Sequence, residues 1–153
     1  MAIRPVKDTD YETLVMMYKK FFRVHNQFQQ SPAEIVKYLK QQAKENLFLV
    51  SEDGAKLNGA LILVREGQNA DGSHTRWKYR HVVFQSDSVG TALLREAEER
   101  VRRASATAKV ELTIAESEPG MAFYKARGYV QEGALKNHYR FGETCFILSK
   151  SFR

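Results

Sequence analysis

The chain has 153 residues, of which 43% are hydrophobic and 27% are charged, and its formal net charge is +6. This length suits one domain with its own core and is too short for two ordinary domains joined by a linker. The composition excludes a disordered chain, and no apolar run approaches the roughly 18 residues that read as a membrane-spanning helix. Basic residues are spread through every segment, so the charge favours an anionic ligand, with nucleic acid as the weaker alternative.

Cysteine and histidine are scarce in this sequence. Cys145 is the only cysteine, which excludes an internal disulfide, and the four histidines are scattered, which disfavours a metal site. No signal peptide is visible. We therefore expect a single domain over residues 1–153 that is cytoplasmic, holds no metal and has no membrane partner.

The N-terminal part of the chain predicts a short strand followed by two amphipathic helices. Ala2–Val6 has the composition of a strand, and the aspartates within residues 8–10 offer side-chain caps to a helix with an apolar stripe. The second helix is expected to begin at Ser31, because a capping serine, Pro32 in the first turn and Glu34 three residues on form a capping box.

The rest of the chain alternates strands and helices without internal repeats. In chain order the expected elements are a hairpin of strands Leu47–Ser51 and Leu57–Arg65, a polar loop Glu66–His74, a strand Thr75–Phe84, a helix after Gly90, a strand Lys109–Ala115, a short helix between Pro119 and Gly128, and strands Tyr129–Glu132 and Thr144–Lys150. The order β-α-α-β-β-β-α-β-α-β-β predicts an α/β fold in which helices pack on a sheet.

The stretch FQSDSVGTALL, residues 84–94, joins a predicted strand to an apolar-periodic helix. In α/β sheets ligands bind beyond the carboxyl ends of strands, where a strand gives way to a loop and a helix. The first turn of a helix leaves about four backbone N–H groups without partners, and its dipole favours an anion such as phosphate. Small residues at Ser86, Ser88, Gly90 and Thr91 allow close approach to the backbone. An ordinary strand-to-helix turn is an equal alternative for this stretch alone.

Three stretches match the motifs of one protein family. Residues 85–90, QSDSVG, fit a signature Arg/Gln-x-x-Gly-x-Gly/Ala, with Ser88 in place of the first glycine. Residues 117–129 fit a segment Asn-x-x-Ala-x-x-x-Tyr-x-x-x-Gly-Phe, with Tyr124 and Gly128 in their places. The opening IRPVKDTDYETL also has its counterpart there. On these motifs the chain resembles the GNAT superfamily of acyl-CoA-dependent N-acyltransferases over nearly its whole length.

The resemblance implies a GNAT-like fold, with a mixed and mostly antiparallel sheet flanked by helices, and transfer of an acetyl group from acetyl-CoA to a primary amine. It implies Tyr124 as the proton donor to the departing thiolate, and a core aromatic beside Phe123 is the alternative for that residue. It leaves a homodimer open. The residues implied to contact the co-substrate are Val82, Val83, Gln85, Ser86, Ser88, Val89, Gly90 and Thr91. A backbone N–H around His81 to Val83 is implied to stabilise the oxyanion.

The general base is not marked by the resemblance, because the strand TRWKYRHVVF lacks the glutamate that many relatives use. His81 is the nearest group with a suitable ordinary pKa, about 6.5. Strand alternation places His81 and Val83 on one face and Arg80 on the other, so His81 is either a base or a packed core residue. Glu111, Glu116 and a water chain are the other candidates.

The acceptor amine is not identified by the sequence. Its binding residues are expected in the segment FRVHNQFQQSP, residues 22–32, and in the loops Glu66–His74 and Lys136–Glu143, because such loops vary within a fold. A non-catalytic acyl-CoA-binding sensor is the alternative function, favoured by Ser88, by the shortened loop before the signature and by the missing strand glutamate. A nucleic-acid-binding module lacks a clustered basic helix and an aromatic stacking signature.

Overall fold

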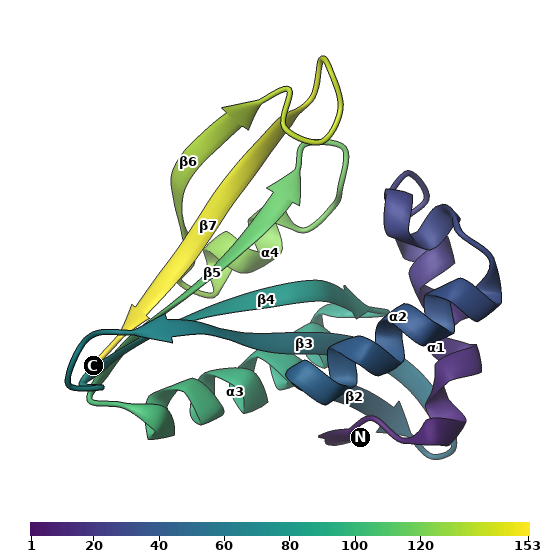
Figure 1. The fold of residues 1–153 in the computed structure, drawn as a ribbon, viewed down its shortest axis with the longest axis horizontal. Helices are drawn as coiled ribbons and strands as arrows, with labels where there is room; N and C mark the ends of the chain where they lie inside the picture. The colour runs from purple at the N-terminus through teal and green to yellow at the C-terminus, as the bar shows by residue number, and fades with distance from the viewer. The chain divides into compact units, whose positions relative to one another are not determined.

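The computed structural model describes every residue from Met1 to Arg153 (Figure 1). The helices and strands are β1 (Ala2–Pro5), α1 (Tyr11–Phe21), α2 (Pro32–Glu45), β2 (Leu47–Asp53), β3 (Lys56–Gln68), β4 (His74–Phe84), α3 (Asp87–Ala104), β5 (Thr107–Ala115), α4 (Met121–Ala126), β6 (Val130–Lys136) and β7 (Thr144–Phe152), with 3-10 turns η1 (Asp8–Asp10) and η2 (Asn26–Gln29). Apart from the two 3-10 turns, this is the predicted order of elements.

The seven strands are hydrogen-bonded in the order β1-β2-β3-β4-β5-β7-β6. The β1–β2, β2–β3, β5–β7 and β6–β7 pairs are antiparallel, whereas β4 and β5 are parallel. The prediction of a mixed, mostly antiparallel sheet flanked by helices is therefore confirmed. The chain divides into two compact units, unit 1 with residues 1–64 and 79–99 and unit 2 with residues 65–78 and 100–153. The prediction of one domain over residues 1–153 stays a prediction.

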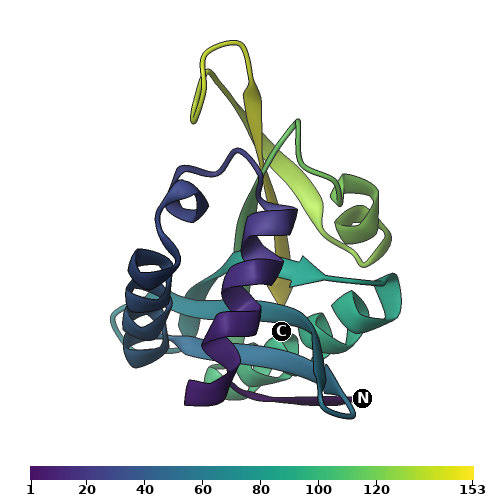
Figure 2. The same cartoon turned by 90° about the vertical axis from the view of Figure 1, so that its right-hand side faces the viewer.

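In unit 1, α1 and α2 cover one face of the strands, and Figure 2 shows the two helices side by side. Successive strand residues point to opposite faces of a sheet. The helix α3 packs on the face opposite to the one that α1 and α2 cover. A Cβ added to Gly59 would lie 2.7 Å from Val89 Cγ1 and 2.9 Å from Leu93 Cδ1, so glycine permits the close approach of α3. The core under α1 and α2 includes Leu14, Tyr18, Phe28, Ile35, Leu39, Phe48, Val50, Ala60, Ile62 and Val83.

The starts of the first two long helices differ in how they are capped. The hydroxyl of Ser31 accepts a hydrogen bond from the backbone N–H of Glu34 at 3.3 Å, and Pro32 is the first residue of α2. This confirms the predicted start. The predicted side-chain cap of α1 is wrong, because Asp10 occupies the N-cap position without capping the helix. Its carboxylate is held by Arg4 instead.

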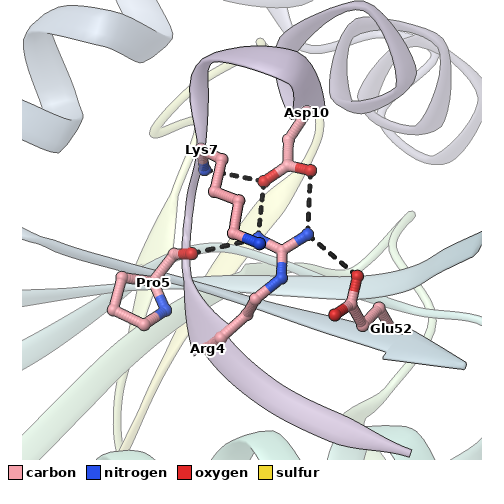
Figure 3. A network of polar contacts seen from close by, with 5 residues as sticks. All are labelled: Arg4, Pro5, Lys7, Asp10 and Glu52. Carbon is pink, nitrogen blue, oxygen red and sulfur yellow. Dashed lines mark hydrogen bonds and ion pairs between the residues drawn. The ribbon is translucent and has the colours of Figure 1, made fainter. Parts of the chain in front are cut away.

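Arg4 organises the polar contacts between β1, η1 and β2 (Figure 3). Its two terminal nitrogens bind the two oxygens of Asp10 at 2.8 and 3.0 Å, and they also reach Glu52 at 3.0 Å and the carbonyl of Pro5 at 3.1 Å. The backbone N–H of Lys7 donates to the same carboxylate at 2.7 Å. We call these five residues the Arg4 network. The guanidinium lowers the pKa of Asp10, against the opposing effect of burial.

Unit 2 contains the hairpin of β6 and β7, with β7 also paired to β5. The helix α4 begins at Met121, two residues later than the predicted start near Pro119, because Gly120 adopts φ +118° at its N-cap. Gly128 follows the helix with φ +91°, as the sequence predicted for a helix stop. The buried residues of this unit include Val110, Leu112, Ile114, Phe123, Tyr124, Tyr129, Leu148 and Phe152.

Candidate functional site

His81 interrupts the regular pleat of β4 in unit 1. Its φ is +52°, a left-handed conformation that costs a non-glycine residue about 1–2 kcal/mol. Alternation would separate the side chains of Arg80 and His81, but both reach α2. Arg80 donates to the side-chain oxygen of Gln42 at 2.7 Å, and the His81 ring is hydrogen-bonded to Tyr38. The predicted placement of Arg80 on the opposite face is therefore wrong, because the backbone turns at His81.

The imidazole of His81 is surrounded by aromatic side chains from α1, η2, α2 and the segment between the helices. We call these side chains and His81 the His81 cluster. Their ring centroids lie 5.0 to 6.1 Å from the His81 centroid, and the ring of His81 itself is half-buried. The surrounding residues are Tyr18, Phe22, His25, Phe28 and Tyr38.

The closest polar contact in this cluster joins Tyr38 and His81. The hydroxyl oxygen of Tyr38 lies 2.6 Å from His81 Nε2, and either atom is the donor depending on the imidazole tautomer. Burial raises the pKa of Tyr38, and the positive charge of Arg80 opposes this effect. Tyr38 is therefore a neutral phenol over the pH range of most enzymes. Sequence reasoning missed Tyr38, because its partner lies 43 residues away in the chain.

Three members of the cluster, Phe22, His25 and Phe28, belong to the segment in which the sequence placed acceptor-binding residues. The structure brings all three to His81, at centroid distances of 6.1, 5.2 and 5.0 Å. His25 Nδ1 also accepts a hydrogen bond from the backbone N–H of Gln27 at 3.2 Å, which caps η2. A predicted base and part of a predicted acceptor segment thus lie together in unit 1.

The second candidate feature of unit 1 is the first turn of α3. The helix begins at Asp87, earlier than the predicted start after Gly90, and the N–H of Gly90 already bonds the carbonyl of Ser86 at 3.0 Å. Ser88, which stands in place of the first glycine of the signature, is helical with a negative φ, so serine adopts this backbone without strain. Asp87 and Ser88 are exposed residues of this first turn, and backbone N–H groups at such positions have no acceptor within the helix.

The other residues of the predicted co-substrate loop differ in what their backbones can offer. The N–H of Gln85 donates to the carbonyl of Asn58 at 2.9 Å and is therefore engaged within the sheet. Val89 and Gly90 are buried, and Val82 and Val83 are 9% and 2% exposed. The exposed residues of this loop whose N–H groups are not bonded within the sheet are therefore 86–88, a shorter stretch than predicted. The hydroxyl of Thr91 donates back to the carbonyl of Asp87 at 2.7 Å.

In unit 2, Tyr124 lies on α4 with its ring packed against Phe123 and Tyr129, at centroid distances of 5.2 and 5.8 Å. It is 5% exposed. Burial raises the pKa of Tyr124, and the negative charge of Glu118 adds to this rise. Burial likewise raises the pKa of Glu118, which the sequence analysis did not select. Tyr124 therefore keeps its proton at neutral pH, which a hydrogen-bond donor requires.

The remaining candidate bases have other surroundings. Glu116 accepts a hydrogen bond from the backbone N–H of Thr144 at 2.7 Å, so it ties the end of β5 to the start of β7. Glu111 is exposed on β5. His81, by contrast, lies among the aromatic rings of the His81 cluster and is hydrogen-bonded to Tyr38. Which of these residues acts as a base stays a prediction.

Two further findings concern the whole chain. No group of three or more His, Cys, Asp or Glu side chains is arranged to hold a metal ion. None of the helices combines the length and apolar character needed to cross a membrane.

Comparisons with known proteins gave matches only at the level of structure. No family model and no curated protein sequence matches the chain. Among solved structures, a ribosomal-protein-alanine N-acetyltransferase from Brucella melitensis superposes with a TM-score of 0.76 at 16% identity, covering 99% of this chain and 100% of that one. Naa50 of Arabidopsis thaliana, in complex with the bisubstrate analogue CoA-Ac-MVNAL, gives a TM-score of 0.76 at 18% identity, covering 99% and 98%.

An aminoglycoside 6'-N-acetyltransferase complexed with coenzyme A gives a TM-score of 0.72 at 15% identity, covering 99% of this chain and 97% of that one. At such low identity these likenesses establish the fold. Together with the order of elements and the sheet topology, they show that the chain has the fold of the GNAT superfamily of N-acetyltransferases.

Proposed function

We propose that the protein is an N-acetyltransferase that moves the acetyl group of acetyl-CoA to a primary amine. The observation that carries the proposal is the exposed first turn of α3, which follows β4 directly in a fold whose solved examples include complexes with coenzyme A and with a CoA-containing analogue. A helix start of this kind binds phosphate through backbone N–H groups and the helix dipole. In this proposal the N–H groups of Asp87 and Ser88 bind the pyrophosphate.

The proposed reaction is a direct attack of the amine nitrogen on the thioester carbon. A C–N bond forms, the carbonyl oxygen gains negative charge, and the C–S bond then breaks to release the CoA thiolate. Backbone N–H groups at Val82 and Val83 are the proposed stabilisers of the oxyanion. His81 accepts the proton that the amine loses, and the phenol of Tyr124 donates a hydrogen bond to the departing thiolate. These roles are consistent with a neutral phenol at Tyr124 and with the half-buried imidazole of His81.

The raised pKa of Tyr124 limits how Tyr124 helps the leaving group. An ordinary thiol has a pKa of about 8.5, so complete transfer of a proton from a less acidic phenol to the thiolate is uphill. A hydrogen bond from the phenol to the developing thiolate still stabilises the transition state. We therefore expect Tyr124→Phe to lower kcat by about tenfold, at or below the low end of general-acid effects. Stopped assays of CoA release at saturating acetyl-CoA and amine would measure this change.

Asp87 offers a sharp test of the pyrophosphate site, because it is the first residue of α3 and is exposed. Proline is favoured at this helix position, so Asp87→Pro removes one N–H and the carboxylate while preserving the helix. Asp87→Asn removes only the negative charge. Calorimetry with acetyl-CoA should show Asp87→Asn binding severalfold more tightly than wild type, and Asp87→Pro binding about tenfold more weakly than Asp87→Asn.

Two outcomes would contradict the proposal at different steps. Equal affinity of the Asp87→Asn and Asp87→Pro variants for acetyl-CoA would show that the pyrophosphate does not bind at the first turn of α3. Tight binding of acetyl-CoA without CoA release, across a panel of peptide N-termini, lysine-like amines, polyamines and aminoglycosides, would contradict the catalytic activity.

A further inference from the structure

The side chain of Tyr38 makes a close polar contact with the candidate base. Its hydroxyl is 2.6 Å from His81 Nε2, although the two residues come from different elements, α2 and β4. His81 is held at φ +52° in a strand, and strained non-glycine residues of this kind concentrate at functional sites. The strain and the hydrogen bond concern the same side chain. Packing alone does not explain why a strand residue keeps a conformation that asparagine or glycine adopts at lower cost.

We propose that Tyr38 is a positioning residue for His81, whose hydroxyl fixes the orientation of the imidazole. The same hydroxyl accepts a hydrogen bond from Nε2–H of the imidazolium that forms when the amine loses its proton. This inference rests on the proposed acetyl transfer and names a residue that supports its base. When the C–N bond forms, one N–H proton of the amine passes to the imidazole. The imidazolium then donates from Nε2 to the phenol oxygen of Tyr38 until the proton leaves to solvent.

The groups that face the imidazole decide how strongly this hydrogen bond acts. The titratable or charged groups around it include Tyr18 from α1, His25 from the segment before η2, Tyr38 from α2, and Arg80, whose charge acts on Tyr38. Arg80 is itself bonded to Gln42 at 2.7 Å. A hydrogen-bond acceptor on a ring nitrogen favours the charged form of an imidazole. Tyr38 supplies that acceptor.

The cluster contains its own matched control. The ring of Tyr18 also faces His81, with centroids 6.1 Å apart, but its hydroxyl is buried without a hydrogen-bond partner. Tyr18→Phe and Tyr38→Phe therefore make the same chemical change at the same ring neighbour. Removing a buried, unpaired hydroxyl stabilises a fold or leaves it unchanged. A purely packing role for both tyrosines predicts that the two variants behave alike.

The experiment measures kcat and kcat/KM for CoA release over a pH range, with acetyl-CoA and the best amine found for the wild type. For Tyr38→Phe we expect kcat to fall about tenfold and the acidic limb of the kcat/KM profile to move to lower pH by about half a unit to one unit, because the imidazolium loses its acceptor. For Tyr18→Phe we expect both quantities to equal those of wild type. Assays at a temperature well below the melting temperatures of both variants ensure that the contrast is not a folding effect.

A second readout does not depend on turnover. The histidine ring signals of the free protein can be followed by NMR as the pH changes, and the His81 signal is assigned by its absence in His81→Asn. In Tyr38→Phe this titration should move to lower pH, in the same direction as the kinetic profile, and in Tyr18→Phe it should stay in place. Agreement of the two readouts would support the positioning role.

The two proposals fail in distinguishable ways. If the wild type turns over an amine and Tyr38→Phe matches Tyr18→Phe in kcat, in pH profile and in NMR titration, the positioning role is overturned while the acetyl transfer stands. If no amine is acetylated by the wild type, the proposed function is overturned and the role of Tyr38 falls with it, even where the NMR titration moves.

Discussion

The Arg4 network and the His81 cluster are two dense groups of contacts within unit 1, and they use their partners in opposite ways. The terminal nitrogens of Arg4 make four hydrogen bonds, three of them to carboxylate oxygens of Asp10 and Glu52. His81 has a strained backbone and a half-buried ring, and it is hydrogen-bonded to a neutral phenol among aromatic rings. In the Arg4 network a cation is paired with two carboxylates, whereas the His81 cluster surrounds an imidazole, a group that can gain or lose a proton.

This difference indicates which group stabilises the fold and which carries chemistry. An ion-pair network with matched charges does not change its protonation near neutral pH, because its carboxylates have lowered pKa values. Histidine is the residue type whose charge ordinarily changes in that range. Strain at His81 has to be stabilised by the surrounding packing, which is typical of sites selected for function. Three experiments can break or sharpen this comparison.

The largest effect is expected for His81→Asn. Asparagine tolerates positive φ, so the turn in β4 is kept while the titratable ring is lost. We expect kcat to fall by about 10²-fold, the size of a general-base contribution, with a loss of stability of about 1 kcal/mol from the missing ring contacts. The matched control is His74→Asn on the same strand, whose ring bonds Thr107 at 2.8 Å and which should keep its activity. An unchanged kcat in His81→Asn would return His81 to a packing role.

The second effect is expected for Arg4→Gln and concerns stability alone. This change leaves the carboxylate of Asp10, with its side chain 7% exposed, without its cationic partner. We expect the free energy of unfolding to fall by about 2 kcal/mol, because a largely buried carboxylate loses two charge-assisted hydrogen bonds. Urea denaturation would measure the loss, with Arg95→Gln at an exposed position as the control. A fall in kcat at a temperature where the variant is folded would contradict the separation of the two groups.

The smallest effect is expected in acid. The pKa of Asp10 is lowered in the folded protein by hydrogen bonds from Arg4, so its contribution to stability is complete above the ordinary value of 3.8 and is lost as the pH falls through the folded value. Denaturation curves at descending pH should therefore converge for wild type and Arg4→Gln below pH 3.8. Parallel curves that keep their separation down to the lowest pH would show that Arg4 acts mainly through packing.

The sequence predicted the order of elements correctly because the signals are local. The capping box at Ser31 and the glycine after α4 each act within one helical turn, and both are confirmed. Boundaries were less accurate where a local signal competed with a distant partner. Asp10 suits an N-cap, but Arg4 on β1 takes its carboxylate. The start of α3 was placed too late, because Gly90 suggested a loop although its N–H bonds Ser86 within the helix.

The candidate site was only partly predictable for the same reason. The roles implied for Tyr124 and for residues 82–91 stay predictions, because no ligand defines them. The segment with His25 and Phe28 was singled out by its position between two helices, and it does lie at His81. Nothing in the sequence pointed to Tyr38, because one aromatic residue on an amphipathic helix has no local feature that marks its partner.

The amino-acid sequence alone determined which segments form helices and strands, since propensity, capping and apolar periodicity are properties of neighbouring residues. It also carried the motifs that indicate the GNAT fold, because these motifs are short and contiguous. Only the tertiary structure decided that His81 breaks the pleat of β4, that Arg80 and His81 both reach α2, and that a phenol from another element bonds the imidazole. These contacts join residues about 40 positions apart, and their geometry exists only after the helices have packed on the strands.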